Sequence, residues 1–311
     1  MRAAIVAITG AWFMSLSSSA PAQVPVRMIA ADSLRAALER RIAQVPGARV
    51  GLVFEPLARG ERIAIAGDTI FHAASTMKVP VMIELFRRID AGALSLEQPL
   101  LLVNSFGSLV DGSSFSVDPA DDSDSTLYAR VGTRVPLREL LERMIERSSN
   151  LATNALIAIV GASNANATAH ALGARTINVR RGVEDVKAFR AGLNNTTSAA
   201  DLAALMLAIE RNTAASPQSC AAMRQILLAQ EFSEEIPAGL PRGVPVAHKT
   251  GWIQGILHDA AIVYPPGRSP YVLVVLTGNI PQEEVARSLI ADLSRIVWEA
   301  TQEPVRDRSG G

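Results

Sequence analysis

Cysteine and lysine are both scarce in this sequence. The 311 residues include one cysteine, Cys220, and the 30 basic side chains include only three lysines, Lys78, Lys187 and Lys249. A single cysteine excludes an internal disulfide and a cysteine metal cluster, so we expect Cys220 to be a small buried residue on a helix. Arginine supplies the ordinary surface charge. Because lysine can lose its proton when desolvated and arginine effectively cannot, the lysines are candidates for chemistry.

The sequence also lacks an excess of charge of either sign. Basic and acidic side chains number 30 each, and loss of a leader containing Arg2 leaves 29 basic against 30 acidic. This balance gives no electrostatic reason to expect a nucleic acid or an anionic membrane as partner. With 49% hydrophobic and 19% charged residues, the composition is that of an ordinary globular core. We therefore expect a small neutral or mixed-charge ligand.

The N-terminus has a short apolar run. Residues 1–22 contain Arg2, an apolar stretch and an Ala-Pro-Ala sequence ending at Ala22. This pattern is typical of a secretory signal peptide cleaved after Ala22. A membrane anchor is the alternative, but polar and glycine residues interrupt the run well before the ~20 apolar residues of a spanning helix. We predict a periplasmic or secreted protein without a stable membrane anchor.

Strand patterns occur at both ends of the chain, with helical patterns between them. Strands are predicted at 48–57, 61–67, 244–251, 257–265 and 271–279. Helices are predicted at 32–45, 75–91, 136–147, 150–160, 164–172, 198–211, 216–230 and 281–300. This order indicates an α/β protein of the α+β type, with one antiparallel sheet built from N- and C-terminal strands. We divide the single domain 23–311 into an α/β lobe, 23–74 and 215–311, and a helical lobe, 75–214.

Residues 104–135 are polar and rich in Gly, Ser and Asp, which predicts a long surface loop. The loop contains Asp118, Asp121, Asp122 and Asp124, a cluster that could suggest calcium. An EF-hand loop needs a glycine at its sharp turn, and none is present there. We therefore predict a solvated acidic loop. The four histidines lack zinc-ligand spacing, so no metal site is predicted.

Ser75 and Lys78 form an S-x-x-K motif at the start of a predicted helix. Residues three apart share a helix face, and a serine at a helix N-terminus lies where a developing anion is favoured. The apolar neighbours of Lys78 would desolvate it, so that its neutral amine could accept the Ser75 proton. The alternative is a capping serine beside a lysine whose ammonium reaches solvent.

Two further motifs bear on this choice. Ser148, Ser149 and Asn150 lie between two predicted helices, and Lys249, Thr250 and Gly251 end a predicted strand. The ordered set S-x-x-K, S-[S]-N and K-T-G resembles the serine β-lactamase and penicillin-binding protein superfamily, most closely the class A β-lactamases. The resemblance runs from about residue 33 to residue 300. It implies the β-lactamase/transpeptidase-like fold and a catalytic domain that needs no metal or organic cofactor.

The resemblance implies a role for each matching residue. Ser75 would be the acylated nucleophile, Lys78 its proton acceptor, and Ser148 a proton relay to the leaving nitrogen. Asn150 would bind the substrate side-chain amide and hold Lys78. Lys249 and Thr250 would bind the substrate carboxylate. Gly251 would let the strand backbone come close to that carboxylate. The backbone N–H groups of Ser75 and Trp252 would form the oxyanion hole. Otherwise, Ser148 and Asn150 would be only a helix N-cap and its turn, and the K-T-G residues an ordinary strand end.

Hydrolysis also requires a general base that activates a water molecule to attack the acyl-enzyme. Glu184 is the first candidate and Asp185 the second, because both precede a threonine-rich helix start, as the class A glutamate does. The chain departs from the family in three places. Ala188 stands where the family has a water-holding asparagine, a role that Asn194 or Asn195 could take in a different loop fold. Ser149 replaces the motif aspartate, and Trp252 is bulkier than the usual residue, so that its indole could narrow the pocket or stack on a substrate.

Other functions remain open from the sequence. A Ser-His-Asp site using His248 or His258 with Asp259 is an alternative, but no G-x-S-x-G motif accompanies it. The superfamily also allows a penicillin-binding protein or D-Ala-D-Ala peptidase, an esterase-like hydrolase, or a sensor that stays acylated. The predicted function is a monomeric class A-like β-lactamase acting on a small β-lactam or a peptidoglycan-like peptide.

Overall fold

The computed structural model describes residues 31–58 and 60–302, so the predicted signal peptide lies outside the described residues. A five-stranded antiparallel sheet has the order β2-β1-β11-β10-β9. Its strands are β1 (Arg49–Pro56), β2 (Ile63–Ile65), β9 (Val246–Ile253), β10 (Ile256–Val263) and β11 (Tyr271–Gly278). The predicted sheet, made from strands near both ends of the chain, is therefore confirmed.

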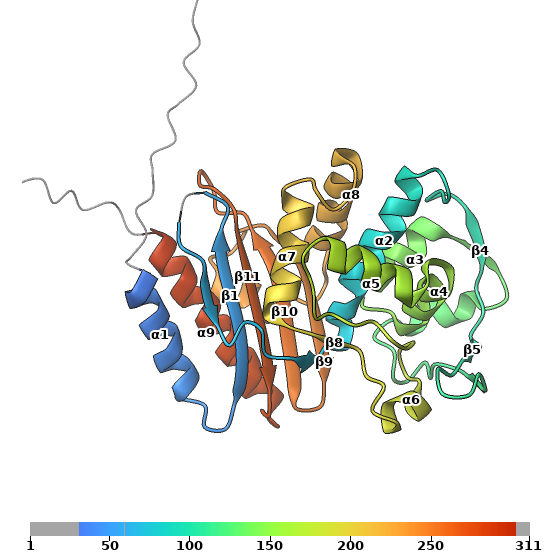
Figure 1. Ribbon diagram of the computed structural model, residues 1–311, viewed down its shortest axis with the longest axis horizontal. Coiled ribbons are helices and arrows are strands. Elements are labelled where there is room, and N and C mark those ends of the chain that lie inside the picture. Colours follow the sequence, from blue (N-terminus) through green and yellow to red (C-terminus); the bar gives the residue numbers. More distant parts are fainter. Residues whose placement is uncertain (1–30, 59, 303–311) are drawn as a thin grey trace, which may run out of the picture.

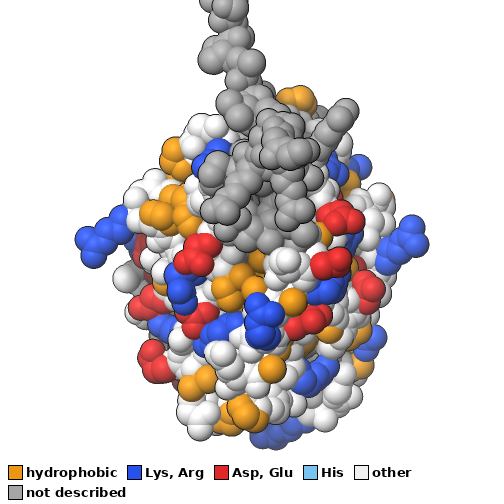
Figure 2. All heavy atoms as spheres, turned by 90° about the vertical axis from the view of Figure 1, so that its left-hand side faces the viewer, with side chains coloured by type: hydrophobic (Ala, Val, Ile, Leu, Met, Phe, Trp, Pro, Cys, Tyr) orange, Lys and Arg blue, Asp and Glu red, His pale blue; other side chains and the backbone are white. Residues whose placement is uncertain are grey.

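Helices cover both faces of the sheet (Figure 1). Helices α1 (Ala31–Ala43) and α9 (Glu283–Gln302) lie side by side on one face. Helix α7 (Ala199–Glu210) covers the other face, and α8 (Pro217–Leu228) contacts strand β9. On the side of the molecule that carries α1 and α9, basic and acidic side chains are interspersed (Figure 2).

Strand β11 is covered on both faces of the sheet. All eight of its residues are buried. Val272 and Val274 face the core shared with the helical region, whereas Leu273 and Val275 face the core beneath α1 and α9. Side chains alternate between the two faces of a strand, so a strand covered on both faces reads as a continuous apolar run. The sequence YVLVVLTG is such a run.

The helical region is built around α2 (Lys78–Asp90), whose residues Lys78 to Phe86 are all buried. Around it pack α3 (Leu137–Glu146), α4 (Asn150–Val160), α5 (Ala162–Ala171) and α8 (Pro217–Leu228). The helix predicted at 150–160 has the expected bounds, and the others agree within a few residues. Cys220 is fully buried on α8, as predicted. No helix in the described ranges is both long and apolar enough to cross a bilayer.

Several short elements were not predicted. Strand β3 (Phe71–His72) pairs with β8 (Thr196–Thr197), and a short helix, α6 (Val186–Arg190), follows Glu184. The loop 104–135 contains β5 (Phe106–Gly107), β6 (Ser114–Phe115) and the 3₁₀ segment Ser125–Arg130, and β4 (Pro99–Leu101) pairs with β7 (Arg134–Pro136) across its base. Elements of two or three residues carry no readable periodicity, because their pairing is set by distant chain segments.

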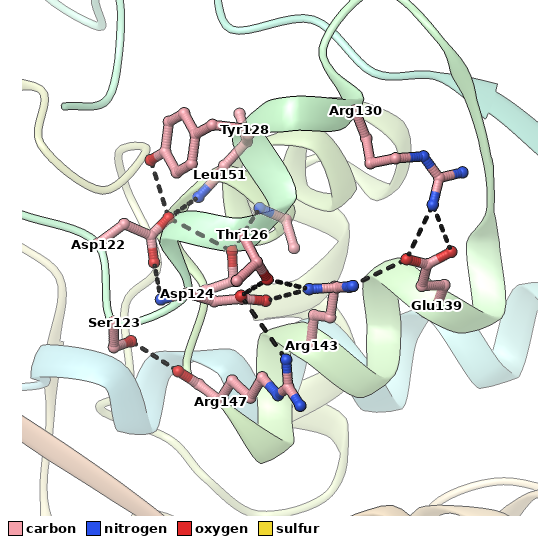
Figure 3. Close-up of polar contacts among 12 residues, drawn as sticks. Asp122, Ser123, Asp124, Thr126, Tyr128, Arg130, Glu139, Arg143, Arg147 and Leu151 are labelled. Atoms are coloured by element: carbon pink, nitrogen blue, oxygen red, sulfur yellow. Dashed lines mark hydrogen bonds and ion pairs between the residues drawn. The ribbon is translucent and has the colours of Figure 1, made fainter. Parts of the chain in front are cut away.

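The prediction of a solvated acidic loop was wrong for two of its four aspartates. Asp118 and Asp121 are exposed, but Asp122 and Asp124 are only 8% and 3% exposed. Asp122 accepts hydrogen bonds from the start of α4, and Asp124 Oδ2 lies 2.7 Å from Arg143 Nη1 (Figure 3). Protein donors thus replace the solvent that these carboxylates were expected to face.

Candidate active site

A cavity of about 940 Å³ opens between the sheet edge and the helical region. Seven of the nine predicted site residues line it: Ser75, Ser148, Asn150, Glu184, Thr250, Gly251 and Trp252. The other two, Lys78 and Lys249, are fully buried. Three motifs that are far apart in the sequence therefore meet at one cavity.

Ser75 lies on a 3₁₀ turn, Ala74–Met77, that leads directly into α2. Residues three apart eclipse one another in a 3₁₀ turn, so Ser75 and Lys78 lie on one side of it. Ala74 has φ 45°, a left-handed conformation that costs a non-glycine residue about 1–3 kcal/mol. His72 Nδ1 accepts a hydrogen bond from Ala74 N over 3.0 Å and supports this turn. Pro80 lies in the first turn of α2, as predicted, where no helical bond to its nitrogen is lost.

Within the described residues, every hydrogen bond of the Lys78 ammonium goes to the S-S-N turn. Its Nζ donates to Ser148 O over 2.5 Å, to Ser148 Oγ over 3.0 Å and to Asn150 Oδ1 over 3.2 Å. Burial, followed by the charge of Lys249, lowers the pKa of Lys78 well below its ordinary value. A buried amine held by neutral acceptors is suited to taking a proton from a neighbouring hydroxyl.

Ser148 links the two buried lysines. Its Oγ lies 3.0 Å from Lys78 Nζ and 3.2 Å from Lys249 Nζ. Burial lowers the pKa of Lys249 to about 7, although the carboxylates of Asp259 and Glu235 oppose the shift. A hydroxyl between two amines with lowered pKa values is placed to pass a proton in either direction.

Glu184 lies across the cavity from the K-T-G strand and contacts Asn150. Its Oε1 accepts a hydrogen bond from Asn150 Nδ2 over 2.9 Å, and its Oε2 accepts one from Asp118 N over 3.2 Å. Burial raises the pKa of Glu184 above its usual value despite these hydrogen bonds. Glu184 has φ 66° and Ser148 has φ 59°. With Ala74, three of the six positive-φ non-glycine residues in the described ranges thus flank or line this cavity.

The loop before Glu184 is held from behind by Asn154. Asn154 Oδ1 accepts a hydrogen bond from Val183 N over 2.7 Å, and its Nδ2 donates to Val183 O over 2.9 Å. A Cβ on Gly182 would lie 2.9 Å from Asn154 Oδ1. Glycine is therefore needed at 182 for this close approach.

Asp185, the second candidate for the base, is occupied by structural contacts. Its carboxylate accepts hydrogen bonds from Ser108 Oγ and Leu109 N at 2.8 Å each, and it caps α6 through Ala188 N. Burial opposes ionisation, but these hydrogen bonds outweigh it and hold the pKa of Asp185 below its usual range. Asp185 fastens the 104–135 loop to α6, whereas Glu184 faces Asn150.

The asparagines considered as replacements at position 188 lie elsewhere. Asn195 is buried, and its Oδ1 accepts hydrogen bonds from Arg180 N and Arg181 N. Asn194 Oδ1 accepts a hydrogen bond from Arg181 Nη2 over 3.4 Å. Ala188 itself is fully buried on α6. Both asparagines therefore bind the loop at Arg180 and Arg181.

Gly251 brings strand β9 against the Ser75 turn. A Cβ at this position would lie 3.1 Å from both Ser75 N and Thr76 N. Trp252 follows on the cavity rim and is 55% exposed. Two other half-exposed aromatic residues, Phe189 and Phe232, also line the cavity. Aromatic side chains therefore line the cavity together with charged ones.

The histidine alternative is not supported by the geometry. His248 Nδ1 lies 3.0 Å from Asp259 Oδ1, but this pair is buried in the sheet and forms no hydrogen bond with Ser75 in the described ranges. His258 Nε2 donates to His72 O over 2.9 Å. Both are strand histidines with satisfied hydrogen-bond partners. No group of three His, Cys, Asp or Glu side chains between residues 31 and 302 (residue 59 aside) is arranged to hold a metal ion.

Comparison with known proteins agrees with the three motifs. Residues 33–301 match the model of the β-lactamase enzyme family. The chain belongs to this family. It is 29% identical over 259 residues to β-lactamase AST-1 of Nocardia asteroides, covering 82% of this chain and 79% of that protein. The resemblance to the serine β-lactamase and penicillin-binding protein superfamily is thereby confirmed.

Solved structures of relatives have the same fold. A β-lactamase from Sphaerobacter thermophilus DSM 20745 is 28% identical with a TM-score of 0.74, covering 88% of this chain and 98% of that chain. A variant of PBP-A in an acyl-enzyme complex with penicillin G is 28% identical with a TM-score of 0.75, covering 89% and 98%. The fold is therefore common to proteins named as β-lactamases and to PBP-A.

Three residues at this β-lactamase-family site were not singled out by the sequence. His72 supports the Ser75 turn, Asn154 holds the loop before Glu184, and Asp122 caps α4 beside Ser148. None belongs to the three motifs. Asp122 was noted only as part of an acidic cluster, because its burial depends on donors that come from other segments.

Proposed function

We propose that this chain is a class A-like serine β-lactamase that hydrolyses the β-lactam amide through an acyl-Ser75 intermediate. The observation that carries the proposal is the position of Ser148 Oγ, 3.0 Å from Lys78 Nζ and 3.2 Å from Lys249 Nζ, at a cavity that Ser75 lines. These hydrogen bonds connect Lys78 of the S-x-x-K motif and Lys249 of the K-T-G motif through Ser148 of the S-S-N turn. Family membership and the relatives named β-lactamases support the substrate class.

Acylation would use Ser75, which lines the cavity, and Lys78, which lies on the same side of the turn three residues later. Lys78 takes the Ser75 proton, Ser75 Oγ bonds to the β-lactam carbonyl carbon, and the ring C–N bond breaks. Ser148 passes a proton to the leaving nitrogen and regains one through the lysines. The backbone N–H groups of Ser75 and Trp252 would stabilise the oxyanion. Lys249 and Thr250 would bind the substrate carboxylate, and Asn150 the side-chain amide.

Deacylation would depend on Glu184. Its raised pKa suits a group that takes a proton from water near neutral pH. Water then attacks the acyl carbon, the bond to Ser75 Oγ breaks, and the proton returns to Ser75. No step requires a metal or an organic cofactor.

A second candidate is a penicillin-binding protein that is acylated by β-lactams without efficient deacylation. Two observations favour it. Ala188 offers no side-chain amide to hold water near Glu184, and PBP-A, of similar fold, has been captured in a variant form as an acyl-enzyme with penicillin G. A peptidoglycan-like peptide would then be the natural substrate.

The test is to mix the mature protein with a chromogenic cephalosporin and follow product at enzyme excess and at substrate excess. A β-lactamase gives continuous turnover, whereas a penicillin-binding protein gives one stoichiometric burst. Mass spectrometry should show the acyl adduct on Ser75. If Ser75→Ala kept the parental activity or the adduct, the proposed function would be wrong.

We also propose that the protein acts outside the cytoplasm as a monomer after cleavage near Ala22. The N-terminal composition supports export. N-terminal sequencing of protein recovered from the periplasm or medium would show Gln23 as the first residue, and light scattering would give the monomer mass.

A further inference from the structure

Asp122 brings a carboxylate to the start of α4 from the 104–135 loop. The carboxylate accepts hydrogen bonds from Asn150 N over 3.0 Å and from Leu151 N over 2.9 Å. Tyr128 OH donates to it over 2.9 Å (Figure 3). The first N–H groups of a helix have no helical partner, and negative charge is favoured at that end. Asp122 therefore binds N–H groups at the start of α4, where Ser149 is the N-cap and its Oγ accepts a hydrogen bond from Ala152 N.

The residues that Asp122 fixes are those that contact the candidate catalytic groups. Ser148 directly precedes the capped turn in a left-handed conformation, φ 59°, and its O and Oγ both contact Lys78. Asn150, whose N–H is bound by Asp122, contacts Lys78 through Oδ1 and Glu184 through Nδ2. A left-handed serine persists only when the surrounding structure holds it.

Position 149 explains why the loop supplies this group. The motif aspartate is replaced by Ser149, and Ser149 Oγ donates toward Asp122 Oδ2 over 3.3 Å. The carboxylate missing from the motif is thus present in space, contributed by a residue 27 positions earlier.

We propose that Asp122 is the positioning residue of this site, holding Ser148 and Asn150 against Lys78, Lys249 and Glu184 in place of an acid at position 149. This inference rests on the proposed function. Asp122 is among the residues that line the cavity, but its carboxylate would act through the S-S-N turn.

The loop that carries Asp122 is fastened to α3. Asp124 N donates to Asp122 Oδ1 over 3.0 Å, and Asp124 Oδ2 lies 2.7 Å from Arg143 Nη1. Ser123 Oγ donates to Arg147 O over 2.6 Å, and Glu139 accepts from Arg143 Nε (Figure 3). Asp124 therefore provides a matched control: it is a buried acid of the same loop that faces α3 instead of the S-S-N turn.

Asp122 also has an electrostatic effect that a purely structural residue would lack. Burial and Lys249, on β9, lower the pKa of Lys78, whereas the charges of Asp122 and Glu184 raise it. Removal of the Asp122 charge should therefore lower the pKa of Lys78 further.

The chain offers a direct measurement, because it contains only three lysines. Protein labelled with ¹³C at lysine Cε gives few signals, and that of exposed Lys187 is identified by Lys187→Arg. We expect Asp122→Asn to lower the Lys78 titration midpoint. Asp124→Asn should lower the thermal midpoint but leave the Lys78 titration unchanged. This readout does not require β-lactam turnover.

Kinetics supply the second readout. Asp122→Asn should slow acylation by a chromogenic cephalosporin about 10- to 100-fold. The double variant Asp122→Asn/Ser149→Asp should recover at least half of the lost acylation rate, measured on a logarithmic scale. Ser149→Asp alone should slow acylation, because it places two carboxylates together. Tyr128→Phe removes one hydrogen bond to Asp122 but keeps its charge, so it should slow acylation a few-fold without moving the titration.

The outcomes separate the two hypotheses. If the parental protein is not acylated at Ser75, the proposed function fails, and the lysine titration still tests Asp122. The positioning role is rejected if Asp122→Asn leaves both the Lys78 midpoint and the acylation rate unchanged. It is also rejected if Ser149→Asp has the same effect with and without Asp122. If Asp122→Asn does not fold, the variants Tyr128→Phe and Ser149→Asp test the positioning role instead. Parental acylation rates in both variants would then reject the positioning role of Asp122.

Discussion

Asn150 Nδ2 donates a hydrogen bond to Glu184 Oε1 over 2.9 Å, while Asn150 Oδ1 accepts one from Lys78 Nζ over 3.2 Å. One side chain therefore joins the candidate acylation base to the candidate deacylation base. The two bases differ in chemistry, since burial lowers the pKa of the Lys78 amine and raises that of the Glu184 carboxyl. They should therefore be separable by mutation.

Glu184→Gln should trap the acyl-enzyme. Glutamine keeps the size of the side chain but cannot accept a proton from water, so steady-state turnover should fall by about 10²–10⁴-fold. The initial burst should keep its amplitude, and mass spectrometry should show a persistent adduct. Asp185→Asn serves as the comparison, because Asp185 faces Ser108 and Leu109. If Asp185→Asn traps the adduct and Glu184→Gln does not, the assignments are reversed.

Lys78→Arg should abolish acylation even though it conserves the charge. Arginine does not release its proton at any accessible pH, so it cannot accept the Ser75 proton. We expect the burst rate to fall by about 10²–10⁴-fold in stopped-flow measurements. Lys187→Arg is the control: Lys187 is exposed and pairs with Asp111 Oδ2 at 3.0 Å. Equal rates for Lys78→Arg and Lys187→Arg would show that neutral lysine is not required.

Gly251→Ala should impair the site by pushing β9 away from the Ser75 turn. The added Cβ would lie 3.1 Å from Ser75 N, closer than ordinary packing allows, and no flexible side chain is there to move. We expect kcat/KM to fall about 10- to 100-fold with a stability loss of about 1–3 kcal/mol. Gly107→Ala, where the nearest atom would be 3.6 Å away, should leave both unchanged. If Gly251→Ala kept the parental kcat/KM, the close approach of β9 to the Ser75 turn would not be needed for activity.

Glu235→Gln should stabilise the protein at alkaline pH but not at acidic pH. Glu235 is 3% exposed, its Oε2 has no hydrogen-bond partner in the described part of the chain, and burial raises its pKa from 4.5 to about 8. A carboxyl group whose pKa is higher in the folded than in the unfolded protein contributes its full stability at pH values below the unfolded-state pKa. That stability is lost as the pH rises through the folded-state pKa. Glutamine avoids this loss.

The size of the Glu235→Gln effect follows from the same linkage. The free energy of unfolding, measured by urea titration, should rise by about 1–3 kcal/mol near pH 8. Near pH 4, where both forms of the protein carry a neutral group, parental and variant proteins should be equally stable. A gain of the same size at both pH values would show that the effect is not ionisation of Glu235.

The main elements of the fold could be predicted because each carries its own periodicity. The YVLVVLTG run of β11 and the 150–160 helix are readable from single segments. The pairing of β3 with β8, the short α6, and the burial of Asp122 and Asp124 could not be read in this way. Each depends on partners far away in the sequence, such as the α4 N–H groups that Asp122 binds.

The order of the residues specifies which groups are available for chemistry: one S-x-x-K, one S-[S]-N and one K-T-G in a chain with three lysines. Spacing along the chain places Lys78 beside Ser75, because three residues make one turn. The orientation of Glu184 toward Asn150, and of Asp185 toward α6, follows from folding. Only the tertiary structure shows that the acid absent at position 149 is supplied by Asp122, because burial and hydrogen-bond donors are properties of the packed chain.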